Sequence, residues 1–205
     1  NFRNWIHVGG FDNILYTPNG KLHRLLTRLA FKNLLHPFQP FIFGQKQIGP
    51  TMASKFGIKL VMYGETGAEY GNKGDENKIP TMDLKYYSYD QDILELTLGG
   101  MKIKEIIKKY GFELKDFIPY LPMTFKKIKD SEIDFHFLSY YRKWDPQEAY
   151  YYSVENTGFS SNTERTEGTY SKYSSIDDKI DYFHYYTTLI KFGIGRATYD
   201  AAQEI

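Results

Sequence analysis

The chain has 205 residues, of which 41% are hydrophobic and 25% charged, a composition typical of a globular protein with a substantial core. Its formal net charge is only +1, which argues against a protein that binds nucleic acid through a strongly basic surface. Cysteine is absent, which excludes disulfides and thiolate metal sites within the chain.

The sequence also lacks the features of membrane and exported proteins. No apolar run approaches the roughly 20 residues that a membrane-spanning helix needs, and no signal peptide is recognisable. We therefore expect a cytoplasmic location and no membrane partner. The first residue is Asn1 rather than methionine, and we expect the chain to be part of a longer protein.

The first half of the chain predicts two helices followed by a strand. Apolar residues repeat at helical spacing over Lys21–His36, and Pro37 and Pro40 end this helix. A second helix is expected over Phe43–Lys55, with Gly57 as its C-terminal cap. The nearly continuous apolar run Ile58–Tyr63 then predicts a central parallel strand that is buried on both faces.

The second half of the chain predicts mainly helices. A polar, loop-like segment over Lys73–Thr97 separates it from the first half. The alternating aromatic residues of Ile133–Tyr141 predict a strand. Asp145 and Pro146 form a strong helix start, because aspartate caps and proline is favoured at the first helical position. The expected helices are Lys102–Tyr110, Leu114–Tyr120, Asp145–Asn156, Ile176–Phe192 and Arg196–Ile205. Gly111 is expected to end the first of these helices, and Gly158 lies just past the expected end of the third.

The segment Gly64–Asn72, with the sequence GETGAEYGN, directly follows the predicted buried strand. A helix, a glycine, a buried strand and a glycine-rich loop make half of a βαβ unit, which predicts an α/β fold. Ligands of such sheets bind beyond the carboxyl ends of the strands. Glycines allow close backbone approach, and carboxylates can hold Mg²⁺. An acidic solvent loop is the alternative, but the position after a buried strand favours a ligand site.

Two further segments are candidates for binding. Thr163–Ser175 is rich in hydroxyl groups and precedes a predicted helix, which suits either a phosphate site or an ordinary capping loop. In Lys191–Asp200, an arginine and an aspartate flank a break between helices, which suits a ligand contact or a surface salt bridge. None of the five histidines has metal-ligand spacing, so no histidine metal site is expected.

Four stretches together resemble the bacterial N-acetyl sugar amidotransferases, which act in lipopolysaccharide and flagellin-sugar biosynthesis. These enzymes belong to the PP-loop ATP pyrophosphatase superfamily. The resemblance implies a Rossmann-like parallel sheet with flanking helices, of the adenine nucleotide alpha hydrolase type, incomplete at its N-terminal side. The stretches are FDNILYTPNGKLHRLLTRLAFKNLLHPFQPFIFGQK, YGETGAEYGN, KWDPQEAYYYSVENTGF and NTERTEGTYSKYSSIDDKIDYFHYYTTLIKFGIGRATYDAAQEI.

The chemistry implied by this resemblance is ATP-dependent amidation. ATP, with Mg²⁺, would adenylate the oxygen of an acetamido group on a sugar, and pyrophosphate would leave. Ammonia from a separate glutaminase subunit would then displace AMP to give an acetamidino group. The superfamily's serine-glycine-glycine-x-aspartate-serine loop and the family's N-terminal cysteines are absent from these residues. The chain therefore matches the C-terminal part, which is expected to be inactive alone.

The resemblance assigns roles to residues in the three polar segments. The expected catalytic residues are Glu65, Glu69 and Lys172. The expected cofactor-binding residues are Gly64, Thr66, Asn72, Ser174 and Ser175, with the two serines meeting either the phosphates or the activated sugar. The expected substrate-binding residues are Arg165, Arg196 and Asp200. The tyrosines of Tyr150–Tyr152 are expected to pack either on the sugar or inside the protein.

The implied organisation has two parts. Residues 1–100 would belong to the nucleotide-binding α/β domain, and residues 101–205 would form a mostly helical region that contributes to substrate binding. The sugar's identity, any nucleotide that carries it and assembly into a homo-oligomer stay open. Two alternative functions remain: a PP-loop enzyme that modifies tRNA, and a non-catalytic carbohydrate-binding module that uses the chain's 19 tyrosines.

Overall fold

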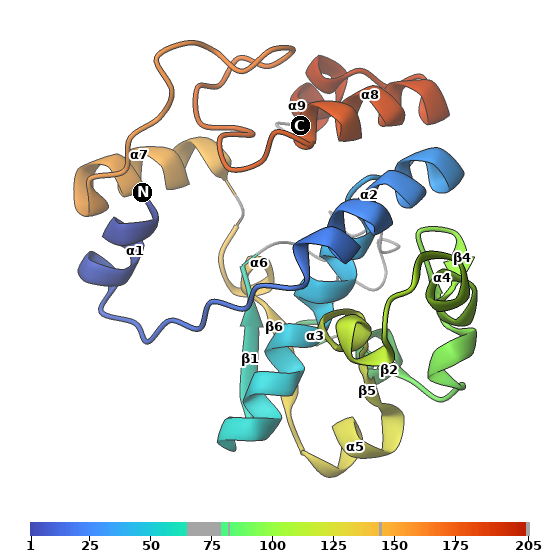
Figure 1. Cartoon of the computed structure of the whole chain (residues 1–205). Helices are drawn as coiled ribbons and strands as arrows, with labels where there is room; N and C mark the ends of the chain where they lie inside the picture. Colours follow the sequence, from blue (N-terminus) through green and yellow to red (C-terminus); the bar gives the residue numbers. More distant parts are fainter. Residues whose placement is uncertain (65–78, 82, 144, 204–205) are drawn as a thin grey trace. The chain divides into compact units, whose positions relative to one another are not determined.

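The computed structural model describes residues 1–64, 79–81, 83–143 and 145–203 (Figure 1). The chain divides into two compact units. Unit 1 comprises Asn1–Thr17, Thr27–Phe38 and Asp145–Ile205, and unit 2 comprises Pro18–Leu26 and Gln39–Trp144. Helices and strands both occur, so the chain is a mixed α/β protein, as the sequence predicts. The functional division near residue 100 stays a prediction.

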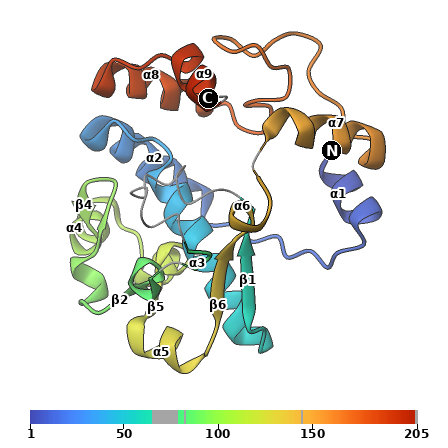
Figure 2. The ribbon, with the colours of Figure 1, turned by 180° about the vertical axis from the view of Figure 1, so that it is seen from behind.

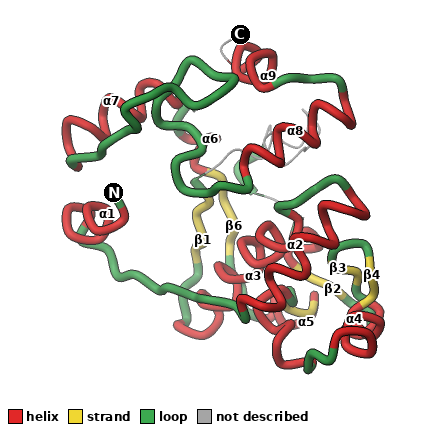
Figure 3. Tube along the Cα trace, turned by 45° about the horizontal axis from the view of Figure 1, so that its top comes forward, coloured by secondary structure: helices red, strands yellow, loops and turns green. Residues whose placement is uncertain are grey.

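The described strands of unit 2 form three two-stranded sheets (Figure 3). β1 (Leu60–Tyr63) runs parallel to β6 (Asp134–Phe137), with Tyr63 opposite Phe137. A second parallel pair joins β2 (Ser88–Tyr89) to β5 (Met123–Thr124). The third pair is antiparallel and joins β3 (Thr97–Leu98) to β4 (Met101–Lys102). The parallel pairing expected for the Ile58–Tyr63 strand is thus confirmed.

The burial predicted for that strand is wrong. Leu60 and Met62 are 51% and 44% exposed, whereas the alternate residues Val61 and Tyr63 pack against the core of unit 2. Such alternation is typical of a strand that is covered on one face only. The apolar run did not reveal this, because hydrophobic side chains occupy both the covered and the open face.

An aromatic stack lies at the centre of the unit 2 core. The ring of Tyr87 stacks on Tyr63 with 5.5 Å between centroids and on Phe135 with 4.4 Å. These rings come from β1, β6 and the 3₁₀ turn η3 (Leu84–Tyr87), so the stack joins three segments that are distant in sequence. The buried residues of this core are Ala53, Tyr87, Met123, Ile128, Ile133 and Phe135.

The helices of unit 2 follow the predicted pattern with shifted ends. The helix expected over Phe43–Lys55 is confirmed as α3 (Gln39–Phe56), and Gly57 caps it with a φ of +70°. It starts earlier than predicted because Pro40 lies in its first turn, where no amide hydrogen bond is lost. The strand predicted over Ile133–Tyr141 is observed as the shorter β6, which ends at Phe137. The remaining elements are α4 (Ile103–Tyr110), α5 (Phe125–Asp130), α6 (Leu138–Tyr141), η4 (Ile93–Glu95) and η5 (Leu114–Tyr120).

Unit 1 is built from helices and a long polar loop. Its helices are α1 (Phe2–Gly9), the C-terminal half of α2 (Gly20–Leu34), α7 (Pro146–Thr157), α8 (Asp181–Phe192) and α9 (Arg196–Gln203). α1 lies alongside α7 (Figure 2), where the Asn4 side chain donates to the carbonyl of Gly158 at 2.9 Å. No helix among the described residues is long and apolar enough to cross a membrane.

The start of α7 is confirmed and the start of α8 is corrected. The Asp145 carboxylate accepts the Glu148 amide at 2.9 Å and caps α7, as predicted. α8 begins at Asp181 instead of residue 176, because the Asp178 carboxylate accepts the Ile180 amide at 2.7 Å and forms a turn. This turn places Asp181 in the first position of α8, beside the hydroxyl-rich segment.

Candidate functional site

The first predicted site begins where β1 ends. Gly64 directly follows β1 and is exposed, and no atom lies within 4 Å of the position that a Cβ would take there. The other residues predicted for this site lie outside the described residues. They are Glu65, Thr66, Glu69 and Asn72. The acidic segment therefore follows a parallel strand in the chain, and Gly64 is the one residue of it that the structure describes.

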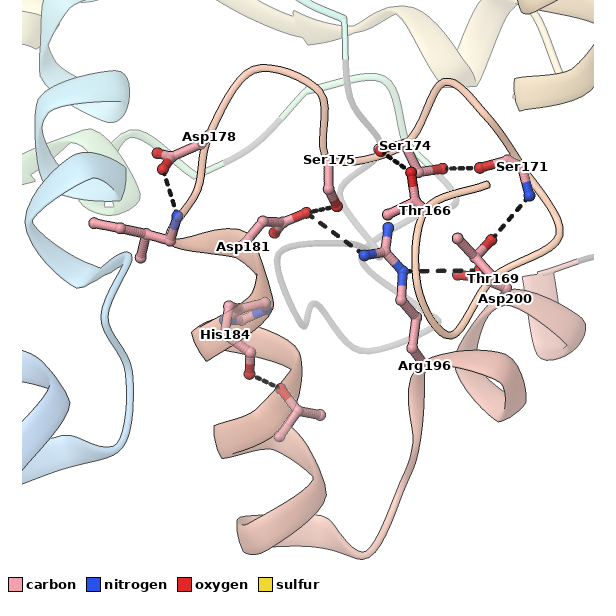
Figure 4. Close-up of polar contacts among 12 residues, drawn as sticks. Thr166, Thr169, Ser171, Ser174, Ser175, Asp178, Asp181, His184, Arg196 and Asp200 are labelled. Atoms are coloured by element: carbon pink, nitrogen blue, oxygen red, sulfur yellow. Dashed lines mark hydrogen bonds and ion pairs between the residues drawn. The ribbon is translucent and has the colours of Figure 1, made fainter. Parts of the chain in front are cut away.

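The second predicted site is a compact loop over residues 162–175 in unit 1 (Figure 4). Backbone hydrogen bonds close the loop: Asn162 donates to the carbonyl of Lys172 at 2.9 Å, and Thr166 donates to that of Ser171 at 3.0 Å. The Thr166 hydroxyl donates to the carbonyl of Ser174 at 2.6 Å, and the hydroxyls of Ser171 and Ser174 bond to each other. The loop thus has its own internal polar network.

Arg196 lies at the centre of this site. Its side chain is only 7% exposed, although it begins helix α9. The guanidinium Nη1 is 4.0 Å from Asp181 Oδ2, and Nε is 4.0 Å from Asp200 Oδ2. The guanidinium carbon lies 4.0 Å from the centre of the Tyr185 ring, which suits a cation–π contact. α8 and α9 therefore both contribute carboxylates to one buried cation, as Figure 4 shows.

Gly168 lets the loop approach the stem of Arg196. Its φ is +77°, a conformation that favours glycine, and a Cβ built there would lie 3.4 Å from the Cβ of Arg196. Ser175, at the end of the loop, also has a positive φ of 54° and donates its hydroxyl to the Asp181 carboxylate. The loop is thus held against Arg196 at one point and against Asp181 at another.

The charges of this cluster do not cancel. Burial raises the pKa of Asp181, and the carboxylates of Asp177 and Asp178 raise it further, while Arg196 lowers it. One guanidinium therefore faces two nearby carboxylates, and an incoming phosphate would meet both of them. A neutral group that donates and accepts hydrogen bonds, such as a sugar hydroxyl, avoids this repulsion.

Several polar atoms of the cluster lack hydrogen bonds. Nε and Nη1 of Arg196 and Oδ2 of Asp200 are buried and have no hydrogen-bond partner within the described part of the chain. A separation of 4.0 Å is too long for a hydrogen bond, so the ion pairs leave these atoms unsatisfied. Buried polar groups are normally hydrogen-bonded, which leaves donors and an acceptor available to a ligand.

Four of the predicted residues come together in this cluster. They are Ser174, Ser175, Arg196 and Asp200. Lys172 and Arg165 belong to the same loop, but both are exposed, and Lys172 contributes its backbone carbonyl to loop closure. Asp181 and Thr166 were not among the predicted site residues. Asp181 had no sequence signal beyond a local excess of aspartates, because its partner Arg196 follows much later in the chain.

The tyrosines of α7 divide between interior and surface. The ring of Tyr150 stacks on Tyr173 with 4.7 Å between centroids, and the Tyr173 hydroxyl donates to Gln147 at 3.2 Å. Tyr151 and Tyr152 are exposed. Tyr150 therefore packs inside the protein and attaches the polar loop to α7, whereas its two neighbours keep exposed aromatic faces.

The described residues include no group of three or more histidine, aspartate or glutamate side chains that is arranged to hold a metal ion. No profile of a known protein family matches the chain, and a comparison with curated proteins finds no match. The family assignment therefore stays an expectation that rests on the four stretches quoted above.

Proposed function

We propose that the chain belongs to an ATP-dependent amidotransferase that converts the acetamido group of a sugar into an acetamidino group. The observation that carries this proposal is the parallel β1–β6 pair, because β1 ends immediately before the acidic, glycine-rich segment. Nucleotides bind at this edge of parallel sheets. A Rossmann-like sheet is the finer fold that the proposal requires.

In the proposed reaction the acetamido oxygen attacks the α-phosphorus of ATP, and pyrophosphate leaves. Ammonia then adds to the activated carbon, and AMP leaves with the former acetamido oxygen. Glu65 and Glu69 are the proposed contacts to the nucleotide and Mg²⁺, and Gly64, Thr66 and Asn72 would line the same segment. Mg²⁺ would neutralise the negative charge that develops on the pyrophosphate as this group leaves.

We assign the cluster around Arg196 to the sugar. The unsatisfied donors of Arg196 and the acceptor of Asp200 can bind hydroxyl groups, and the excess of carboxylates disfavours a phosphate there. Of the two alternatives for Ser174 and Ser175, we therefore favour contact with the activated sugar. Lys172 and Arg165 are exposed on the same loop, where they would meet the sugar's anionic carrier, if it has one.

The proposal also specifies partners. A separate glutaminase subunit would supply ammonia, and the acetamido sugar and ATP would be the two substrates. Neither nucleic acid nor a membrane is required, and the reaction would take place in the cytoplasm, where ATP is available. Residues 1–100 would contribute the nucleotide side and residues 101–205 the substrate side.

The decisive test is an assay of the complete protein that contains this chain. It would be incubated with ATP, ammonia and a panel of acetamido sugars, with AMP and the acetamidino product as readouts. Glu65→Gln should lower turnover strongly, whereas Glu155→Gln on the exposed face of α7 should not. Unchanged turnover in Glu65→Gln would remove that residue from the site.

The same preparation separates the alternative functions. Binding of tRNA that weakens steeply with salt would favour a tRNA-modifying enzyme. Sugar binding that is indifferent to ATP, without AMP formation, would favour a carbohydrate-binding module, for which Tyr151 and Tyr152 offer exposed rings. Either result would refute the amidotransferase proposal.

A further inference from the structure

Lys46 is a half-buried cation of unit 2 to which the sequence assigned no role. It lies on α3, and its ammonium nitrogen is 3.5 Å from the centre of the Tyr86 ring. Burial lowers the pKa of Lys46 to about 8. Within the described part of the chain, no carboxylate lies at ion-pair distance from it. Among the described residues, its charge is therefore offset by the face of the Tyr86 ring and by no carboxylate.

Tyr86 has an unsatisfied hydroxyl group beside this cation. Its Oη is buried and has no hydrogen-bond partner among the residues that the structure describes. Burial raises the pKa of Tyr86 to about 12, so the hydroxyl keeps its proton and can donate. Lys46 and Tyr86 thus provide neighbouring donors, and a buried donor without an acceptor is costly.

The pair lies near the carboxyl end of the parallel strands. The hydroxyl of Tyr63, the last residue of β1, donates to the backbone carbonyl of Lys46 at 3.2 Å. One turn further along α3, a Cβ on Gly49 would lie only 3.2 Å from Val61, so the helix packs directly on β1. α3 therefore brings Lys46 to the end of β1 at which the chain continues into the acidic segment.

The segment that starts at Pro80 brings Tyr86 to the same end of the parallel strands. The amide of Phe137, the last residue of β6, donates to the carbonyl of Pro80 at 3.1 Å, and η3 with Tyr86 follows. The edge-to-face contact between Tyr86 and Tyr87 fixes the Tyr86 ring against the aromatic stack of the core. Both donors therefore belong to the edge of the sheet where ligands of α/β proteins bind.

We infer that Lys46 and Tyr86 bind a phosphoryl oxygen of the nucleotide at the carboxyl end of β1 and β6. This inference rests on the proposed function, which supplies a triphosphate. A phosphoryl oxygen is an anionic acceptor that would satisfy both donors at once. Lysine binds phosphate as a point charge, so it needs no bidentate geometry.

The test uses the complete protein and inorganic pyrophosphate, with binding measured by calorimetry. Lys46→Met should weaken binding about tenfold or more, because a charge-assisted hydrogen bond is lost. Tyr86→Phe keeps the ring and removes the hydroxyl, and should weaken binding roughly threefold. Lys55→Met is the matched control, since Lys55 is exposed near the other end of α3 and should leave binding unchanged.

A second readout is independent of whether the variants bind. Pyrophosphate should raise the pKa of the Lys46 ammonium, followed by NMR of the lysine side chains, because a nearby anion favours the charged form. A pKa that does not move, or equal binding by wild type and Lys46→Met, would overturn the inference. Absence of pyrophosphate binding by the wild type would overturn it as well.

The two proposals fail in different ways. Lys46-dependent binding of pyrophosphate, without AMP formation in the sugar assay, would retain the phosphate site and reject the amidotransferase. AMP formation that is indifferent to Lys46→Met, with unchanged pyrophosphate affinity, would retain the amidotransferase and reject the phosphate site.

Discussion

Replacing Arg196 with methionine should destabilise unit 1 strongly. Methionine keeps most of the arginine stem but removes the cation, so the carboxylates of Asp181 and Asp200 lose the one positive charge that the described cluster places beside them. Removing one member of a buried ion pair costs about 3–5 kcal/mol. The two carboxylates are 21% and 15% exposed and lie 4.0 Å from the guanidinium, so we expect the lower limit, about 3 kcal/mol.

The loss is measurable by urea denaturation and by thermal unfolding. A loss of about 3 kcal/mol corresponds to a decrease of roughly 6–12 °C in Tm for a chain of this size. Arg165→Met is the matched control, because Arg165 belongs to the same loop but is exposed. The control should change the free energy of unfolding by less than about 0.5 kcal/mol.

The dependence on pH identifies the cause. Burial already raises the pKa of Asp181, and loss of the cation should raise it further. A carboxyl group whose pKa is raised in the folded state lowers the free energy of unfolding as the pH rises from its unfolded pKa to the raised folded pKa. The difference in free energy of unfolding between wild type and Arg196→Met should therefore be largest at neutral pH and should decrease toward pH about 4. The role assigned to Arg196 would be refuted if Arg196→Met lost no more free energy of unfolding than Arg165→Met. It would also be refuted if the loss were equal at both pH values.

Three further predictions concern the backbone and the α3 helix. Gly168→Ala should lower the free energy of unfolding by about 1–2 kcal/mol, because its φ is +77°, whereas Gly20→Ala, without a positive φ or a close contact, should not. Gly49→Leu should cost about 1–3 kcal/mol in chemical denaturation, because the side chain would meet Val61; a neutral result would contradict the tight packing of α3 on β1. Lys46→Met should raise Tm at pH 7, and the gain should decrease as the pH rises from 8 to above 10, since the lowered pKa shows that the folded state disfavours the ammonium.

Local signals predicted local structure well. The cap formed by Asp145, the proline after it and the glycine that ends α7 are each determined by neighbours in the sequence, and the structure confirms all three. The glycine caps after α3 and α4 are confirmed for the same reason. Helix ends of this kind depend on backbone conformations that few residue types adopt, so one sequence suffices to find them.

Burial and contacts between residues that are distant in the sequence were harder to predict from the sequence. The strand at Ile58–Tyr63 was correctly expected to pair in parallel, but its exposed face depends on which elements cover it. α8 starts late because a side chain of a preceding turn competes for a backbone amide. The contact of Arg196 with Asp181 joins two helices, and no spacing rule connects these residues. The spacing of Arg196 and Asp200, at i and i+4, is local and was therefore visible.

The dependence of the polar loop on Arg196 has a consequence for synthesis of the protein. Residues 162–175 are synthesised before Arg196, so Gly168 meets its arginine partner only after translation has reached α9. The hydroxyl groups of the loop are therefore in the chain before its charged centre. Premature termination before α9 would therefore leave this loop without the cation that orders it, even though every loop residue is present.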